Sequence, residues 1–146
     1  MVLAKQDGDS YLDRYSKELT VFYGIIDGSI TEITRFTLGH SVNDSHSDAN
    51  SSGALPLFYK GGALTDYDVS TNTAPKWAYQ DVKQTRTFVE LEQDLGTNWM
   101  AKAIFTRNDL DSEWPSLYLS GAPDPITEEG LRAKASFYEA ADKEEI

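Results

Sequence analysis

Two stretches decide the fold: residues 17–27 read KELTVFYGIID, and residues 33–42 read ITRFTLGHSV. Successive side chains of a β-strand point to opposite faces, so the period-two pattern of both stretches predicts strands. The same-face positions are Leu19, Val21, Tyr23 and Ile25 in the first strand, and Phe36, Leu38, His40 and Val42 in the second. Between them, residues 27–29 (Asp-Gly-Ser) have the composition of a tight turn and predict a hairpin.

A second hairpin is predicted further along the chain. Residues 85–95 and 99–108 alternate in the same way, and residues 94–98 (Asp-Leu-Gly-Thr-Asn) supply the turn between them. In the opposed register, Glu90 or Glu92 meets Lys102 across the strands. An exposed ion pair of this kind contributes little stability, so it indicates only which side chains share a face of the sheet.

The connections between these strands are unequal in length. Two tight turns alternate with two long segments, residues 43–84 and 109–130. Transmembrane barrels have short turns at one rim and long loops at the other, and their strands carry one apolar and one polar face. An antiparallel sheet with one face on a soluble core is the alternative, and the pattern by itself favours that alternative.

Composition limits the function classes. The chain has 146 residues, which suits one domain, and 24 acidic against 13 basic residues give a net charge of −11. This charge and the lack of a basic cluster argue against nucleic acid, and the lack of cysteine excludes disulfides and thiolate chemistry. No apolar run approaches the ~18 residues of a membrane helix, but a transmembrane strand needs only about 9–11. The N-terminal sequence has no signal-peptide pattern.

The C-terminal stretch, residues 127–146, fits two structures. Thr127 is a suitable helix cap, and Leu131, Ala135 and Tyr138 have helical spacing. Residues 131–137 also place Leu, Ala, Ala and Phe at alternate positions, as a strand does. Propensity alone favours the helix.

Six short stretches of the sequence carry a family resemblance. They are GALPLFY at 53–59, TDYD at 65–68, APKWAY at 74–79, TFVELE at 87–92, GTNW at 96–99 and TRNDLDS at 106–112. Together they resemble TonB-dependent ferric-siderophore receptors of the coprogen and hydroxamate group. The order, spacing and residues of the stretches agree from about Tyr11 to the C-terminus, whereas no single stretch is specific.

The resemblance implies an all-β fold, namely antiparallel hairpins from an outer-membrane barrel of about 22 strands with a plugged lumen. It implies a location in the bacterial outer membrane, contact with its lipid, import of a ferric siderophore, and energy relayed by the inner-membrane TonB protein through the plug. The turns near Ser29 and Gly96 are then periplasmic, residues 43–84 and 109–130 are extracellular loops, and the chain after Leu131 is a strand rather than a helix.

The resemblance covers the barrel wall only. No plug domain, energy-coupling box or aromatic-ended final strand is matched, so residues 1–146 are expected to be a partial barrel domain with four complete strands and parts of others. Four strands cannot close such a barrel, and open strand edges are untenable within lipid. We therefore expect that this segment by itself transports nothing.

Aromatic residues of the two long connections are the best candidates for ligand binding. Aromatic rings with a polar handle can contact a ferric chelate through flat surfaces and hydrogen bonds. Packing within the loops, or an aromatic belt at the membrane interface, is the alternative role. The candidates are Phe58, Tyr59, Trp77, Tyr79, Trp114 and Tyr118.

Metal sites have weaker support. His40, Asp44, His46 and Asp48 have suitable ligand chemistry, but their spacing matches no closed site. The acidic groups at 109–113 and 66–68 lack the glycine and glutamate of a calcium loop. Iron reaches receptors of this family already chelated, so we expect no protein-bound cofactor.

No enzyme motif is present. The sequence contains no GxSxG, P-loop or GxGxxG pattern, and no carboxylate pair in a glycosidase context. Together with the family resemblance, this absence of motifs predicts a non-enzymatic receptor segment. The alternative is a soluble antiparallel β-domain that binds a small ligand or a protein through residues 43–84.

Overall fold

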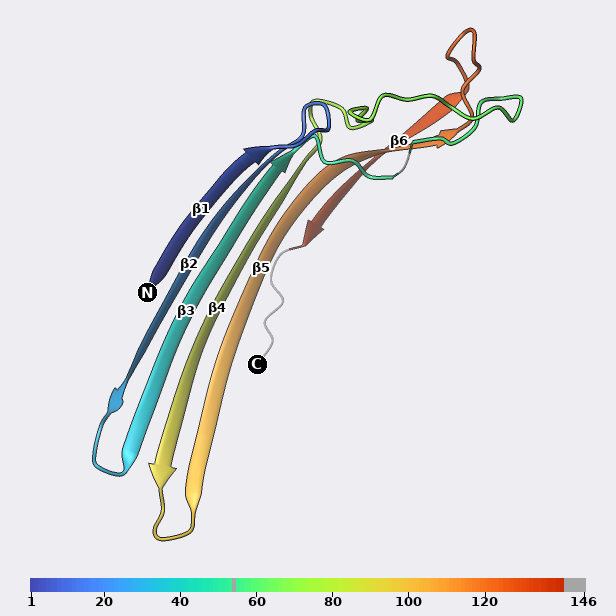
Figure 1. The fold of residues 1–146 in the computed structure, drawn as a ribbon. Coiled ribbons are helices and arrows are strands. Elements are labelled where there is room, and N and C mark those ends of the chain that lie inside the picture. The colour runs from blue at the N-terminus through green and yellow to red at the C-terminus, as the bar shows by residue number, and fades with distance from the viewer. Residues whose placement is uncertain (54, 141–146) are drawn as a thin grey trace.

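The computed structural model describes residues 1–53 and 55–140, which form one antiparallel β-sheet (Figure 1). Its six strands lie in the sheet in chain order, so the sheet is a meander. The all-β antiparallel prediction is confirmed. The strands are β1 (Val2–Asp9), β2 (Ser16–Ser29), β3 (Thr34–Asp48), β4 (Tyr79–Asp94), β5 (Met100–Gly121) and β6 (Leu131–Ala140).

The sheet has two different ends. Residues 30–33 join β2 to β3 and residues 95–99 join β4 to β5, and both turns lie at what we call the turn end (Figure 1). Residues 10–15, 49–78 and 122–130 lie at the opposite end, which we call the loop end. The predicted alternation of tight turns and longer connections is therefore present.

The strands extend further toward the loop end than the sequence predicts. β3 continues to Asp48, β4 begins at Tyr79 and β5 runs to Gly121, so the long connections shrink to 49–78 and 122–130. The added stretches are rich in Asn, Asp and Ser, which have low strand propensity. Pairing on both sides compensates: Asn43 is opposite Val21 on β2 and Gln84 on β4.

The predicted turn at residues 27–29 is wrong. These residues still belong to β2, where Gly28 lies opposite Phe36, and the chain reverses at 30–33 instead. The ring of Phe36 lies across Gly28, because a Cβ there would be only 2.9 Å from the ring. Gly28 is therefore needed for a close approach within the hairpin and not for a reversal of the chain.

The two terminal strands differ in how well they are predicted. β1 was not expected, because Val2–Asp9 is largely polar and shows no clear alternation. β6 confirms the strand that the family resemblance implies for the chain after Leu131. Residues 125–127 form a turn and residues 128–130 have no regular secondary structure, so no helix begins at Thr127. Residues 141–146 lie outside the described residues.

The predicted register of the second hairpin is confirmed. Lys102 is directly opposite Glu92, and its Nζ lies 2.5 Å from Oε1 of Glu90 and 3.2 Å from Oε1 of Glu92. All three side chains therefore lie on one face of the sheet.

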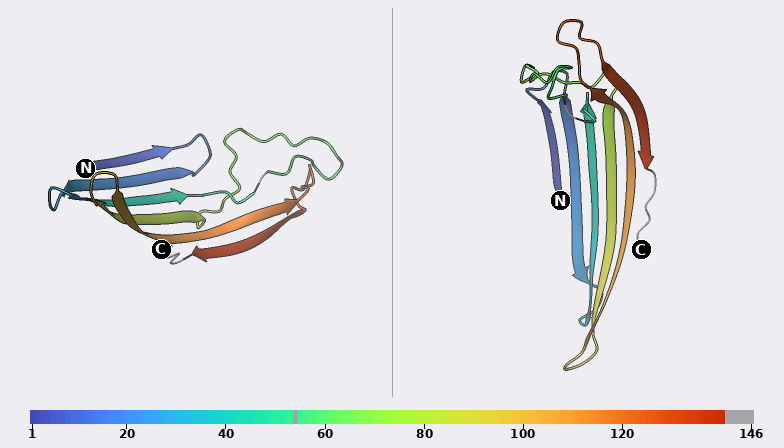
Figure 2. Two further views of the ribbon diagram at one scale, coloured as in Figure 1. Left: turned by 90° about the horizontal axis from the view of Figure 1, so that it is seen from below. Right: turned by 90° about the vertical axis from the view of Figure 1, so that its right-hand side faces the viewer.

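The sheet is bowed along its strands, and the 49–78 connection lies inside the bow at the loop end (Figure 2). Tyr118 of β5 packs against Gly53 of this connection, because a Cβ on Gly53 would lie 2.8 Å from the Tyr118 ring. We therefore call the face that carries Tyr118 the inner face and the opposite face the outer face. Each register runs without interruption, so cross-strand partners share a face throughout.

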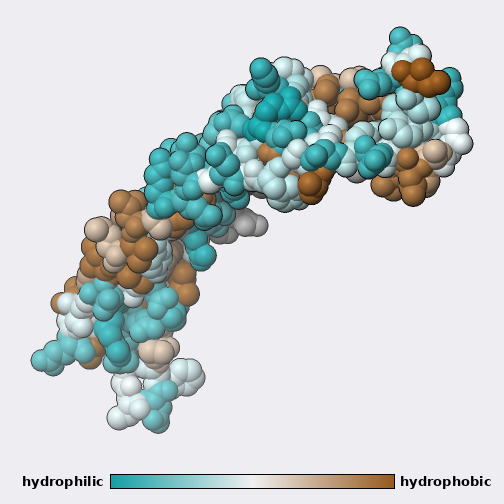
Figure 3. Space-filling model, turned by 45° about the horizontal axis from the view of Figure 1, so that its top comes forward, coloured by the Kyte–Doolittle hydropathy of each residue, from teal (hydrophilic) through white to brown (hydrophobic). Residues whose placement is uncertain are grey.

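An apolar row crosses the outer face in the turn-end half of the sheet. Ile26, Leu38, Val89 and Phe105 are cross-strand neighbours in this row, and each is at least 36% exposed. The next row toward the turn end contains Phe36 and Leu91. On the side that Figure 3 presents, hydrophobic side chains likewise gather toward the turn end, and a hydrophilic zone follows toward the loops.

In the turn-end half of the sheet, the inner face is more polar than the outer face, with Glu90, Glu92 and Lys102 on it. Not every apolar strand residue lies on the outer face. The register places Leu19 opposite Ser45 and Val21 opposite Asn43, on the inner face. β2 has apolar residues on both faces, so its own sequence pattern cannot decide which of them belongs to the apolar outer face of the sheet.

The described residues contain almost no conventional core. The buried hydrophobic residues are three alanines of the 49–78 connection itself, namely Ala49, Ala74 and Ala78. No described segment covers the apolar outer row. In this respect the sheet differs from that of a soluble domain, whose apolar face is covered by its own chain. β1 and β6 are the two edges of the sheet. In the described part of the chain, no helix has the length and apolar character needed to cross a membrane.

Candidate functional site

The inner face of the β5–β6 hairpin carries a group of aromatic and hydroxyl side chains at the loop end. Trp114 is opposite Tyr138, with their ring centres 5.9 Å apart and their planes tilted by 36°. One residue pair further on, Ser116 and Ser136 hydroxyls lie 3.2 Å apart, and Ser116 is fully buried. This hairpin therefore presents three aromatic side chains to the inside of the bow, Trp114, Tyr118 and Tyr138, which we call the inner aromatic wall.

The indole N–H of Trp114 is a distinctive polar group of this wall. Its Nε1 is buried and has no hydrogen-bond partner among the described residues. An indole N–H can only donate, and unsatisfied buried donors are uncommon in proteins. The wall therefore contains one donor that is enclosed by the protein and has no acceptor among the described residues.

Asn72 holds the 49–78 connection against the ends of the strands. Its side-chain Nδ2 donates to the carbonyl oxygens of Asp13 and Ala49, both at 2.9 Å, and its Oδ1 accepts from the Ala74 N–H at 2.9 Å. Arg14 Nη2 donates to the Asn72 carbonyl oxygen at 2.6 Å. One buried amide thus joins the β1–β2 connection, the end of β3 and the chain before β4.

The far part of the same connection is fixed to the β5–β6 hairpin. The N–H of Lys60 donates to the carbonyl oxygen of Pro123 at 2.8 Å, and Gly53 lies against Tyr118. The connection therefore spans the inner side of the loop end from the β1–β2 connection to the β5–β6 connection.

The six predicted ligand-binding residues do not form one cluster. Trp114 and Tyr118 lie on the inner face of β5, two residue pairs apart along the hairpin. Phe58 and Tyr59 lie in the connection, where Phe58 forms an isolated bridge with Leu64. Trp77 is half exposed in the turn that precedes β4.

Tyr79 lies on the opposite side of the sheet from Trp114 and Tyr118. Its hydroxyl donates to Glu113 Oε1, and its ring stacks on His46 with ring centres 6.1 Å apart. The bond to the Glu113 carboxylate raises the pKa of the Tyr79 hydroxyl above its ordinary value. The structure thus groups Tyr79 with outer-face residues beyond the apolar rows rather than with the inner aromatic wall.

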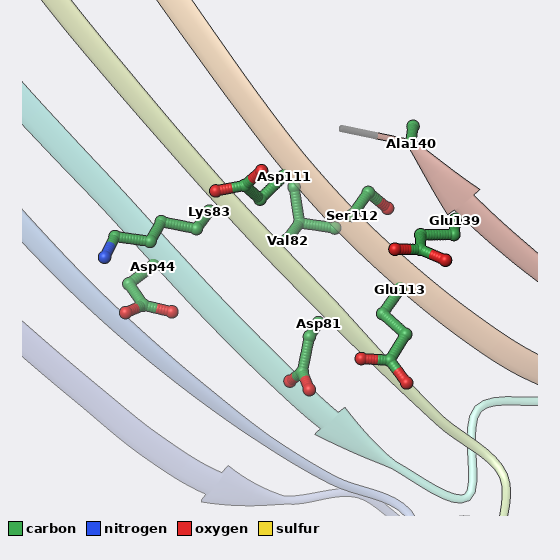
Figure 4. A pocket seen from close by; sticks show the side chains of 9 residues that line it. All are labelled: Asp44, Asp81, Val82, Lys83, Asp111, Ser112, Glu113, Glu139 and Ala140. Carbon is green, nitrogen blue, oxygen red and sulfur yellow. The ribbon is translucent and has the colours of Figure 1, made fainter. Parts of the chain in front are cut away.

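His46 is enclosed by carboxylates on this outer face. Its Nδ1 bonds to Asp81, and its Nε2 lies 3.3 Å from Oδ1 of Asp48. The bond to Asp81 is the main reason that the pKa of His46 is raised above 6.5. Asp81, Glu113 and Glu139 follow one another across β4, β5 and β6 next to it (Figure 4).

The residues considered as metal ligands belong to the outer face. His40, Asp44, His46 and Asp48 alternate along β3, and His40 Nδ1 is 2.8 Å from the Thr87 hydroxyl. Among the described residues, no group of His, Asp and Glu has the geometry of a metal site. Asp109, Asp111 and Glu113 alternate along β5 in the same way, which is strand geometry and not a calcium loop.

Sequence reasoning missed Tyr138, Arg132 and Lys134 on the inner face of β6, and Asn72 in the connection. The first three depend on the strand assignment of residues 131–140, after which period-two alternation places them together. Nothing in the sequence distinguishes Asn72 from other loop asparagines.

Comparison with known proteins identifies the relatives of this chain. No family model matches it. It is 35% identical over 97 residues to a ferric-pyoverdine BN7/BN8 receptor of Pseudomonas putida, covering 66% of this chain and 12% of the receptor. It is 30% identical over 102 residues to a ferripyoverdine receptor of Pseudomonas aeruginosa, covering 69% of this chain and 12% of the receptor.

The chain is homologous to part of the ferripyoverdine receptors. A ferric-pyoverdine 358 receptor of Pseudomonas putida is also similar, with 29% identity over 117 residues, 80% of this chain and 14% of the receptor. The chain therefore spans about one eighth of the length of these relatives.

Solved ferripyoverdine receptors have the same fold over this segment. A crystal structure of the Pseudomonas aeruginosa outer-membrane ferripyoverdine receptor bound to ferripyoverdine matches with a TM-score of 0.83 and 25% identity. The match covers 94% of this chain and 18% of the receptor. A complex of the receptor FpvAI with pyocin S2 matches equally well, with the same TM-score, identity and coverage.

These relatives confirm the siderophore-receptor resemblance and refine it. The three curated relatives are receptors for ferric pyoverdines, whereas the sequence motifs suggested the coprogen and hydroxamate group. The relatives are receptors rather than enzymes, in agreement with the expectation from the sequence.

Proposed function

We propose that residues 1–146 form part of the barrel domain of an outer-membrane receptor that binds and imports a ferric siderophore of the pyoverdine class. The observation that carries the proposal is the match of 94% of the chain to a ferripyoverdine-bound receptor at a TM-score of 0.83. The coprogen and hydroxamate subtype suggested by the motifs receives no support from the relatives.

The two faces fit this role. The exposed outer row of Ile26, Leu38, Val89 and Phe105 suits lipid, because barrel strands alternate apolar residues outward and polar residues inward. The strands continue past the apolar rows toward the loop end, so the aromatic wall and the 49–78 connection stand on the extracellular side. Iron enters this scheme as part of the chelate and not as a protein cofactor.

The inner aromatic wall is the proposed contact with the siderophore. Trp114 and Tyr118 supply flat aromatic surface on the inner face for contact with the chelate. Phe58, Tyr59 and Trp77 can approach the same ligand from the connection. Tyr79 is the weakest of the six candidates, because it lies on the outer face.

Transport requires more than this segment. An edge strand inside a membrane has unpaired backbone groups, so β1 and β6 need further strands beside them. Energy coupling through TonB belongs to the whole receptor in this proposal. We expect no uptake of ferric siderophore from the chain expressed without such partner strands.

The direct test uses a hybrid receptor, namely a Pseudomonas aeruginosa ferripyoverdine receptor whose aligned segment is replaced by this chain. We expect the hybrid to bind radiolabelled ferric pyoverdine and to restore its uptake in a receptor-deficient strain. Trp114→Ala with Tyr118→Ala should weaken binding by about tenfold or more, since aromatic anchors dominate such contacts.

The matched control for that variant is Trp99→Ala, because Trp99 is exposed at the turn end, far from the proposed site. Equal binding by the unaltered hybrid and the Trp114/Tyr118 variant would count against the inner wall. A monodisperse monomer of the chain in water without detergent would favour the soluble β-domain instead.

A further inference from the structure

Charge is divided between the two faces of the sheet at the loop end. The relevant strand parts begin at the cross-strand row of Tyr23, Ser41, Arg86 and Asn108 and run from there toward the loops. On their inner face the described residues include no carboxylate. Their outer face carries ten: Asp7, Asp9, Glu18, Asp44, Asp48, Asp81, Asp109, Asp111, Glu113 and Glu139.

The inner face of the same region carries cations only. These are Lys17, Arg86, Arg132 and Lys134. Among the described residues none of the four forms an ion pair, and Arg86 lies 5.9 Å from the ring centre of Phe88. In a chain of net charge −11, an inner wall with four cations and no acid is a marked asymmetry.

Two of these cations belong to the aromatic wall itself. Lys134 is directly opposite Tyr118, and Arg132 is directly opposite Ser120. Directly opposed side chains have Cβ atoms about 4.5–5.5 Å apart, within easy reach of one ligand. The Ser116–Ser136 pair and then the Trp114–Tyr138 pair follow along the same face. The two cations and the three aromatic rings therefore share one side of the hairpin.

We propose that Arg132 and Lys134 are specificity-determining residues that select ferric chelates with net negative charge at the inner aromatic wall. This inference rests on the proposed siderophore-binding function and adds the charge class of the ligand. A surface of one sign raises the local concentration of ligands of the opposite sign and speeds their association. The planar guanidinium of Arg132 can also pair with a carboxylate in two parallel hydrogen bonds.

The charge of a ferric chelate depends on its donor groups. Three hydroxamates carry one negative charge each and balance iron(III), so a trihydroxamate chelate is neutral at the metal. A catecholate or hydroxycarboxylate donor in place of one hydroxamate leaves excess negative charge. The cationic wall therefore favours mixed-donor chelates over trihydroxamates.

The test measures binding of radiolabelled ferric pyoverdine to the hybrid receptor at low and high salt. Arg132→Gln with Lys134→Gln should weaken binding by about tenfold at low salt, and the loss should shrink as salt screens the charges. Arg132→Lys with Lys134→Arg keeps both charges and should restore most of the affinity. Arg132→Glu with Lys134→Glu should bind more weakly than the glutamine variant.

The matched control removes two cations from the other face of the same strand parts. Lys5→Gln with Lys83→Gln leaves the inner wall unchanged and should alter the affinity less than about twofold, because these side chains face away from the ligand. Equal losses of affinity from the inner and outer glutamine pairs would overturn the proposal. So would equal affinities of the charge-keeping, glutamine and glutamate variants of Arg132 and Lys134. An unaltered hybrid that binds no ferric siderophore would instead overturn the proposed function, and this inference with it.

Discussion

Tyr118 of β5 lies directly against Gly53 of the 49–78 connection, although the two residues are far apart in the sequence. A Cβ on Gly53 would approach Cδ2 of the Tyr118 ring to 2.8 Å, and the φ of Gly53 is +122°. Only glycine adopts this backbone region without strain and leaves room for the ring. The contact fixes the connection over the inner aromatic wall and thereby sets the shape of the proposed binding site.

Gly53→Ala should release the connection from β5. The added methyl group meets the Tyr118 ring, and the positive φ is strained for alanine, at a cost of about 1–3 kcal/mol. We expect faster amide hydrogen exchange in residues 49–78, with the strands unaffected.

Gly61→Ala is the matched control, because nothing lies within 4 Å of a Cβ at that position. It should leave hydrogen exchange almost unchanged. Similar exchange in both variants would mean that the Gly53–Tyr118 contact does not hold the connection.

Asn72→Ala should loosen both ends of the connection together. The substitution leaves the carbonyl oxygens of Asp13 and Ala49 and the N–H of Ala74 without their partner, at a cost of about 1–3 kcal/mol. Limited proteolysis should then cut near residues 10–15 as well as in 49–78. Asn50→Ala removes one side-chain bond, to Gln80, and should cost less than about 1 kcal/mol. Protection of residues 10–15 in the Asn72 variant would contradict this coupling.

His46 should make the loop end of β3 and β4 more stable in mild acid. The bond to Asp81 raises the pKa of His46 above 6.5 in the folded state, at a position beyond the apolar rows. Its stabilising contribution is therefore fully present below the unfolded pKa of about 6.5, and it is lost as the pH rises through the folded value.

An NMR titration of the His46 imidazole measures this directly. Asp81→Asn removes the main cause of the shift, so the pKa of His46 should fall back toward 6.5. A folded-state pKa at or below 6.5 in the unaltered sequence would refute the proposed role of Asp81.

A charge in the apolar row of the outer face should be far more harmful than one on the inner face. Leu38→Lys places an ammonium in the row that we assign to lipid, at a cost of about 2–4 kcal/mol near the middle of the bilayer. Val21→Lys changes an inner-face residue and should be tolerated. The measurement is the amount of folded hybrid receptor in the outer membrane. An equal decrease in folded receptor for both variants would show that the outer row is no more in contact with lipid than the inner face.

The sequence was sufficient for the hairpins and for the register of the second one. Apolar alternation located β2, β3, β4 and the first half of β5, and the charges of Glu90, Glu92 and Lys102 predicted which side chains meet. These features are local, because period-two patterning and short connections need no tertiary information.

Strand ends and faces required the structure. Asn43–Asp48 and residues 109–121 have the composition of loops, and pairing with neighbouring strands makes them extended. Val21 is apolar but lies on the inner face opposite Asn43, because the strand register and not its own polarity decides its side. The candidate site was predicted in part: Trp114 and Tyr118 share the inner wall, whereas Tyr79 does not. Arg132 and Lys134 become visible only after β6 is assigned as a strand.

Single cysteines test the central claim most directly, because the chain contains no cysteine of its own. In the hybrid receptor, Leu38→Cys and Val89→Cys lie on the outer face, and Ser41→Cys and Arg86→Cys lie on the inner face. If the outer face contacts lipid, a water-soluble thiol reagent should label the inner pair and spare the outer pair. Rapid labelling of Leu38→Cys and Val89→Cys in the folded hybrid would contradict the account.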